Sequence, residues 1–193
     1  GWRGVSERFK HIHLSNNFSQ VYEVIASVIQ KDPIAWESFT NLYAKDFESL
    51  LKKYQNHPLF SDHDTELSTV IYGCYPLHPV STFILPRLSE KVAQNERTLF
   101  TFLSAEGVST LHAFLAEAPD SCFSLLTPDI IYDYFEPLFK KESYGGDIYN
   151  QYILTEKILT ELVPLSLEAK IVKTISLIYI LGQHERLKPT KEE

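Results

Sequence analysis

Aromatic and aliphatic residues recur at steps of three and four along most of this chain. The longest such series covers about five helical turns and comprises Trp36, Phe39, Tyr43, Phe47, Leu50 and Tyr54. The alternation of apolar and polar residues that is typical of a half-buried strand is nearly absent. The sequence therefore predicts an all-α fold in which several amphipathic helices pack as a multi-helix, bundle-like domain.

Capping residues and prolines bound the expected helices. Asn16 or Asn17 can cap a first helix, which ends before the proline of Lys31-Asp32-Pro33. Asp64 can cap a short helix, and Pro79 suits the first turn of another, which Pro86 must kink or divide. Further helical patterns cover residues 99–103, 111–115, 130–139 and 148–162, with Thr127-Pro128 as a cap and first-turn pair and Gly145-Gly146 as a turn.

The C-terminal segment has a pattern of its own. Residues 167–181 are apolar on more than one face, which predicts a helix that is buried on several sides, and Gly182 ends it. Pro189-Thr190-Lys191-Glu192 can cap and start a further helix. This order of helix, turn and helix indicates the start of a truncated winged-helix or helix-turn-helix unit. We therefore expect a helical domain over 1–164 and the start of that unit over 165–193.

Composition excludes several classes of function. The 193 residues are 44% hydrophobic, which supports a substantial core. A net charge of -7 and a pI near 5.5 argue against broad, charge-driven binding to nucleic acid or to an anionic membrane. Two cysteines are too few for a disulfide framework, and no apolar run is long enough to span a bilayer. We expect a cytoplasmic protein without a membrane segment.

The sequence carries none of the common catalytic motifs. It has no G-x-x-x-x-G-K-[ST], no G-x-G-x-x-G, no H-E-x-x-H and no nucleophile elbow. His11 and His13 lie two residues apart, but their neighbourhood offers no further ligands, so no metal site is expected. We predict no catalytic residue in these 193 residues.

His78 differs from the other histidines because it stands directly before Pro79 at an expected helix start. The positive end of the helix dipole disfavours an imidazolium there, and a neutral ring could donate a hydrogen bond to an oxyanion or a phosphate. The simpler interpretation is a structural cap or a core histidine. Both interpretations stay open.

Arg97 is the second candidate for phosphate contact. A guanidinium presents a planar fork of donors that stays charged, as when an arginine completes a nucleotide site from a neighbouring domain. The alternative is a pair with the carboxylate of Glu96. Gln94 and Asn95 could orient Arg97 or cap its helix, and Arg87 is a further supporting residue in this polar segment.

Three blocks of the sequence resemble parts of large prokaryotic P-loop ATPases. The central block contains Tyr75-Pro76-Leu77-His78-Pro79, Leu85-Pro86-Arg87-Leu88 and the run from Gln94 to Leu103. Residues 2–9 are similar to the segment that follows the motor core of these proteins. Residues 169–175 with Leu187-Lys188-Pro189-Thr190 are similar to the entry of a winged helix. The family is akin to AAA+ and signal-transducing ATPases, and some members are of the phage-exclusion type found in phage-defence islands.

The resemblance implies that residues 1–164 form a helical lid or regulatory domain C-terminal to a nucleotide-binding core. Catalysis, ATP and Mg²⁺ would then belong to the parent protein's upstream core, which would be the partner of this region, and no cofactor is expected in the fragment itself. By analogy with related lids, His78 and Arg97 would sense phosphate. The family's phosphate loop and acidic metal-binding strand have no counterpart in this sequence.

Two hypotheses follow. In the first, the chain is a regulatory lid that couples nucleotide state to domain movement. In the second, it is a helical protein-protein interaction module, in which the segment from Gln94 to Thr98 is a structural polar core and exposed aromatic residues form an interface with a protein partner or within an oligomer. Under the second hypothesis, loss of the Arg97 side chain destabilises the fold. The acidic charge gives no support to DNA binding, which stays open for the parent protein.

Overall fold

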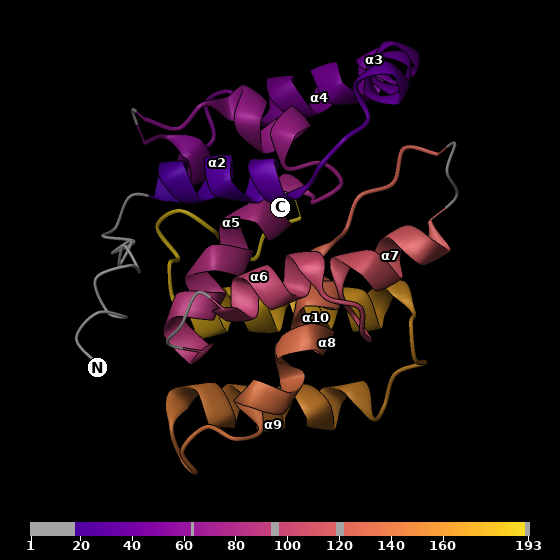
Figure 1. The fold of residues 1–193 in the computed structure, drawn as a ribbon. Helices are drawn as coiled ribbons and strands as arrows, with labels where there is room; N and C mark the ends of the chain where they lie inside the picture. Colours follow the sequence, from indigo (N-terminus) through magenta and orange to yellow (C-terminus); the bar gives the residue numbers. More distant parts are fainter. Residues whose placement is uncertain (1–17, 63, 94–96, 119–121, 192–193) are drawn as a thin grey trace, which may run out of the picture.

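The computed structural model describes residues 18–62, 64–93, 97–118 and 122–191, and it consists of helices joined by loops (Figure 1). The α-helices are α2 (Phe18–Val28), α3 (Pro33–Leu42), α4 (Ala44–Tyr54), α5 (Pro79–Leu88), α6 (Arg97–Ser104), α7 (Leu111–Glu117), α8 (Pro128–Phe139), α9 (Asp147–Leu159) and α10 (Leu167–Leu181). A 3₁₀ turn, η1 (Pro58–Phe60), and two π-helical turns, η2 (Thr69–Gly73) and η3 (Ser89–Ala93), complete them. The predicted all-α class is confirmed.

Helix α5 lies in the centre of the fold. All of its residues are buried, which fits a sequence that is apolar around the whole helix. In Figure 1, α2, α3 and α4 lie on one side of α5, and α9 lies at the opposite edge of the molecule. Helix α10 packs against α5, α8 and α9. None of the helices described is long and apolar enough to cross a membrane.

The predicted helix over 36–54 is interrupted. It is two helices, α3 and α4, which meet at Tyr43, where the backbone leaves the helical region with φ -105 and ψ 25. The break lets aromatic rings from both helices reach one cluster. Phe39 and Phe47 lie 5.3 and 5.5 Å from the ring of Tyr75, and 6.5 and 5.1 Å from that of Phe123. The prediction of one continuous helix was wrong because tertiary aromatic contacts outweigh helical continuity here.

Pro86 lies inside α5 and does not divide it. Proline lacks the N–H that would bond to the preceding turn. The chain continues into the π-helical turn η3, at whose start the amide of Ser89 donates to the carbonyls of both Leu85 and Pro86. A wider turn of this kind takes up the change in hydrogen bonding after a helix-internal proline.

Helix α10 is less enclosed than expected. Gly182 ends it in the left-handed conformation, with φ 68, as predicted. The prediction of burial on several sides holds for the faces toward α8 and α9, but Leu167, Ile171 and Tyr179 are exposed. Residues 183–191 form turns and irregular structure, so no second helix begins within the described part of this segment. The winged-helix unit stays a prediction.

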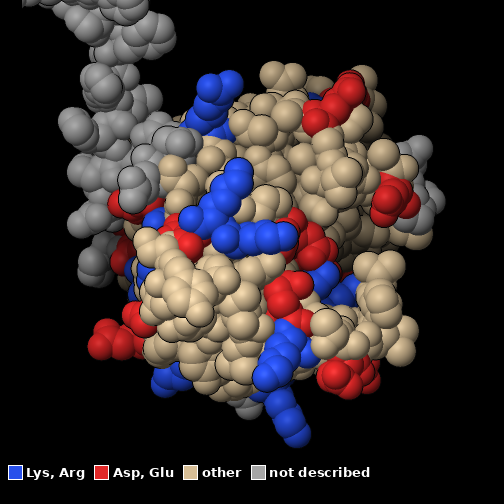
Figure 2. Space-filling view, turned by 90° about the horizontal axis from the view of Figure 1, so that it is seen from below, with Lys and Arg blue, Asp and Glu red and all other residues tan. Residues whose placement is uncertain are grey.

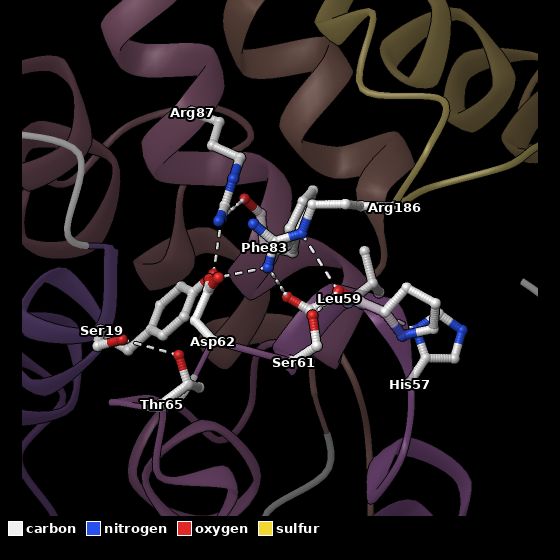
Figure 3. A network of polar contacts seen from close by, with 11 residues as sticks. Ser19, His57, Leu59, Ser61, Asp62, Thr65, Phe83, Arg87 and Arg186 are labelled. Carbon is white, nitrogen blue, oxygen red and sulfur yellow. Dashed lines mark hydrogen bonds and ion pairs between the residues drawn. The ribbon is translucent and has the colours of Figure 1, made fainter.

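Two arginines that lie near the Phe83 ring, Arg87 and Arg186, join remote parts of the chain (Figure 3). Arg87 is only 3% exposed, and its guanidinium carbon lies 3.6 Å from the centre of the Phe83 ring. Its Nη1 donates to the hydroxyl of Tyr22 at 2.6 Å. Arg186, from the C-terminal segment, lies 5.3 Å from the same ring and donates to the carbonyl of Leu59. We call Tyr22, Phe83, Arg87 and Arg186 the arginine cluster.

The arginine cluster holds more positive charge than its surroundings neutralise. Arg186 pairs with the half-exposed Asp62 at 2.8 Å. Within the described residues, Nε and Nη2 of Arg87 have no hydrogen-bond partner. Burial lowers the pKa of Arg87 and raises that of Tyr22, and the contact between the two groups opposes both shifts. The guanidinium is therefore held by aromatic rings and neutral oxygens, and its role is structural.

We predict that Arg87→Ala lowers the free energy of unfolding by about 3 kcal/mol, because it leaves a cavity and an unpaired buried phenol at Tyr22. Arg87→Met, which refills the space without a charge, should cost less. The matched control is Arg97→Ala, which removes an exposed arginine and should cost less than about 0.5 kcal/mol. Urea denaturation measures all three variants. Equal losses for Arg87→Ala and Arg97→Ala would contradict the structural role.

Candidate functional site

A short pairing of remote backbone segments places the starts of α5 and α8 side by side. Leu77 and Leu126 form an isolated parallel bridge. The amide of Leu126 donates to the carbonyl of Pro76 at 2.8 Å, and the amide of His78 donates to the carbonyl of Leu126 at 3.0 Å. The hydroxyl of Ser81 donates to the same carbonyl. The bridge thus brings together two helix N-termini, whose dipoles have their positive ends there.

His78 caps α5 through its side chain. Its Nδ1 accepts a hydrogen bond from the amide of Val80 at 3.1 Å, and Pro79 occupies the first turn. Because Nδ1 is an acceptor, the neutral ring carries its proton on Nε2, which is a donor. The histidine is therefore a structural cap, as the simpler interpretation held, and it keeps one N–H for a further partner.

A pocket of about 500 Å³ lies beside His78, between α8, α10 and the C-terminal segment. We call it the His78 pocket. Its apolar lining consists of Val80, Pro128, Leu167, Ile171, Ile175, Ile178 and Pro189. Its polar lining consists of His78, Thr127, Asp129, Lys170, Thr174, Thr190 and Lys191. An apolar floor with a few polar groups is typical of sites for small molecules or for single side chains of a partner.

The charged groups of the His78 pocket differ in burial. Asp129 is 7% exposed and accepts a hydrogen bond from the hydroxyl of Thr127. Lys170 and Lys191 are exposed, and no ion pair links either to another described residue. The carboxylate is thus engaged inside the wall, whereas the two ammonium groups are accessible.

The environment of His78 holds it in the neutral form. Burial and, to a lesser extent, the positive charge of Lys53 lower its pKa from 6.5 to about 4. The ring of Tyr54 lies 6.2 Å from the ring of His78 and 5.2 Å from the ring of a second capping histidine, His57. His57 also precedes a proline and caps the turn that follows, η1, by accepting from the amide of Leu59. The His-Pro dipeptide, which occurs at both positions, is a sequence signal for a histidine that caps the helical turn after it.

The other predicted site residues do not join His78. Arg97 is exposed at the start of α6 and is not part of the pocket lining. Arg87 belongs to the arginine cluster, is buried, and is not part of the lining of the His78 pocket. Gln94, Asn95 and Glu96 lie outside the described residues, as do His11 and His13. The polar contribution of Lys170, Lys191, Thr127 and Asp129 was not expected, because these residues come together only through the packing of α10 on α8.

The two cysteines differ in their surroundings. Cys74 is buried, which raises the pKa of its thiol to about 12, and Cys122 is exposed. The described residues contain no group of three or more histidine, cysteine, aspartate or glutamate side chains that could hold a metal ion. Within the described part of the chain, the His78 pocket is the strongest candidate because fixed donors and positive charge meet an apolar cavity there.

Comparison with known proteins returned no match. No family model matches the chain. No curated protein and no solved structure is similar to it at a significant level.

We predict that protonation of His78 destabilises the fold. The pKa is lower in the folded state than in the unfolded chain, so stability is complete above about pH 6.5 and falls as pH decreases toward 4. After allowance for partial exposure, we expect a loss of about 2 kcal/mol across this range. His78→Asn keeps a good cap without a titrating group and should remove this part of the pH dependence.

The control for this prediction is His184→Asn, at an exposed histidine. It should leave the slope of unfolding free energy against pH unchanged between pH 4 and 7. If His78→Asn also left that slope unchanged, the neutral cap would be ruled out.

Proposed function

We propose that this chain is a helical regulatory module that responds to the nucleotide state of an associated ATP-binding core, with the His78 pocket as its contact for phosphate. The observation that supports this best is the pocket wall, where His78, the cap of α5, and the N-terminus of α8 at Thr127 and Pro128 line the same cavity. Both features favour a phosphate oxygen. Lys170 and Lys191 at the rim add accessible positive charge.

Movement of the module would follow from a difference in contact. A nucleotide favours a closed arrangement only if the pocket binds it better in that arrangement than in the open one. Arg97 supports the same proposal from a separate surface, because its exposed guanidinium is accessible to a neighbouring domain. The two sensing candidates would then act at different places, His78 in the pocket and Arg97 across a domain boundary.

Calorimetric titration tests the proposal on the isolated chain. ATP and ADP should bind with dissociation constants of about 1 mM, a value typical of a few charge-assisted contacts, and adenosine should give no heat. His78→Asn should weaken ADP binding at least about threefold because it removes the Nε2 donor, and Arg97→Ala should not. Absence of heat with all three ligands, or equal heat from adenosine and ADP, would overturn the proposal.

The second candidate function is a helical protein-protein interaction module with a structural polar core. The arginine cluster favours it, because this polar group joins separate elements of the fold through hydrogen bonds and ring contacts. The exposed apolar residues of α10 favour it as well. Figure 2 shows acidic and basic side chains interspersed around the face seen from below, without a large area of one sign, so this face gives no support to nucleic-acid binding.

A further inference from the structure

One face of α10 carries a row of large apolar side chains. Leu167, Ile171, Ile175 and Tyr179 follow one another at steps of four, which places them along one side of the helix. Leu167 is 69% exposed, Ile171 47% and Tyr179 52%, and Ile175 is half-buried. The row spans about 18 Å. We call it the α10 row.

The other faces of α10 are occupied. Ser176 bonds to Thr155 of α9, and Lys173 pairs with Asp133 of α8 at 2.6 Å. Single exposed apolar residues are ordinary on protein surfaces, but a continuous row of this length marks an interaction site. Within the described residues, the α10 row is the face of this helix that the fold leaves uncovered.

The His78 pocket runs along most of the α10 row. Leu167, Ile171 and Ile175 form one side of it, and Val80 and Pro128 form part of the other. A volume of about 500 Å³ is ample for one large apolar side chain. An apolar row beside such a pocket matches the way in which grooves bind amphipathic helices, through side chains at positions i, i+4 and i+7.

The charges beside the row select the partner. Lys170 and Lys191 lie at the rim of the pocket, and no described residue pairs with either. Asp129, the described acid of the lining, is buried and bonded to Thr127. Glu168 is exposed on the same helix, three residues before Ile171. This local basic rim in a chain of net charge -7 favours an acidic flank on the partner's side facing Lys170 and Lys191.

We propose that the α10 row and the His78 pocket together bind an amphipathic helix of a partner protein, whose apolar side chains lie on Leu167, Ile171 and Tyr179 and whose acidic flank faces Lys170 and Lys191. This inference rests on the second candidate function. It adds the kind of partner, the surface that binds it and the orientation of its charged flank.

The test uses a lactam-stapled helical peptide of about 15 residues, with leucine at i, i+4 and i+7 and glutamate along one flank. Two matched peptides replace the glutamates by lysine or scramble the leucine positions. Fluorescence anisotropy with the full chain should give a dissociation constant in the range of tens of micromolar for the acidic peptide, and binding at least about tenfold weaker for the other two.

Variants of the chain locate the binding surface. Ile171→Asp, at an exposed position, should weaken the acidic peptide at least about tenfold, whereas Ile34→Asp, at a 79% exposed residue of α3, should not. Lys170→Glu should shift the preference toward the lysine peptide, and Glu168→Lys should not weaken the acidic one. Circular dichroism confirms that each variant is folded.

Several results would overturn the inference. They are no binding of the acidic peptide, equal binding of the scrambled one, or equal losses from Ile171→Asp and Ile34→Asp. Concentration-dependent dimerisation that Ile171→Asp abolishes would assign the α10 row to a second copy of the chain instead. The assay contains no nucleotide, so failure of ADP binding in calorimetry leaves its outcome unchanged, and the two proposals fail separately.

Discussion

The arginine cluster around the Phe83 ring of α5 joins α2, the turn η1 and the C-terminal segment to the central helix. Through Arg87 the central helix α5 holds Tyr22 of α2, and over the same ring Arg186 ties the C-terminal segment to the turn at Leu59. That segment continues into Pro189, Thr190 and Lys191, which close one side of the His78 pocket. The arginine cluster thus holds one wall of the His78 pocket in place.

Helix positions could be predicted from sequence because they depend on local pattern and capping. The start of α5 at Pro79 and the end of α10 at Gly182 follow from residue chemistry alone. The break at Tyr43 could not, since the periodic pattern continues through it and only contacts with Tyr75 and Phe123 explain it. The exposure of the outer face of α10 could not be predicted for a related reason. An apolar side chain looks the same in sequence whether the fold or a partner covers it.

The candidate site was predictable only in its local part. His78 before Pro79 indicates a neutral cap, and the structure has that cap. The bridge between Leu77 and Leu126, which places α8 next to it, joins segments about fifty residues apart and has no sequence signal. The structural polar core was predicted for the segment from Gln94 to Thr98, of which Gln94, Asn95 and Glu96 lie outside the described residues. Arg97 is exposed, whereas Arg87 is buried. Arg87 is surrounded by aromatic rings and Arg97 lies on the surface, and that difference arises only from tertiary packing.

The proposed contact with phosphate depends on His78 as a neutral ring that keeps its proton on Nε2. The most direct test is two-dimensional long-range ¹H–¹⁵N NMR of the His78 imidazole between pH 5 and 8. The account predicts the Nε2–H tautomer throughout, with no titration in this range because burial lowers the pKa to about 4. A ring that is protonated on Nδ1, or one that titrates near pH 6.5, would contradict it.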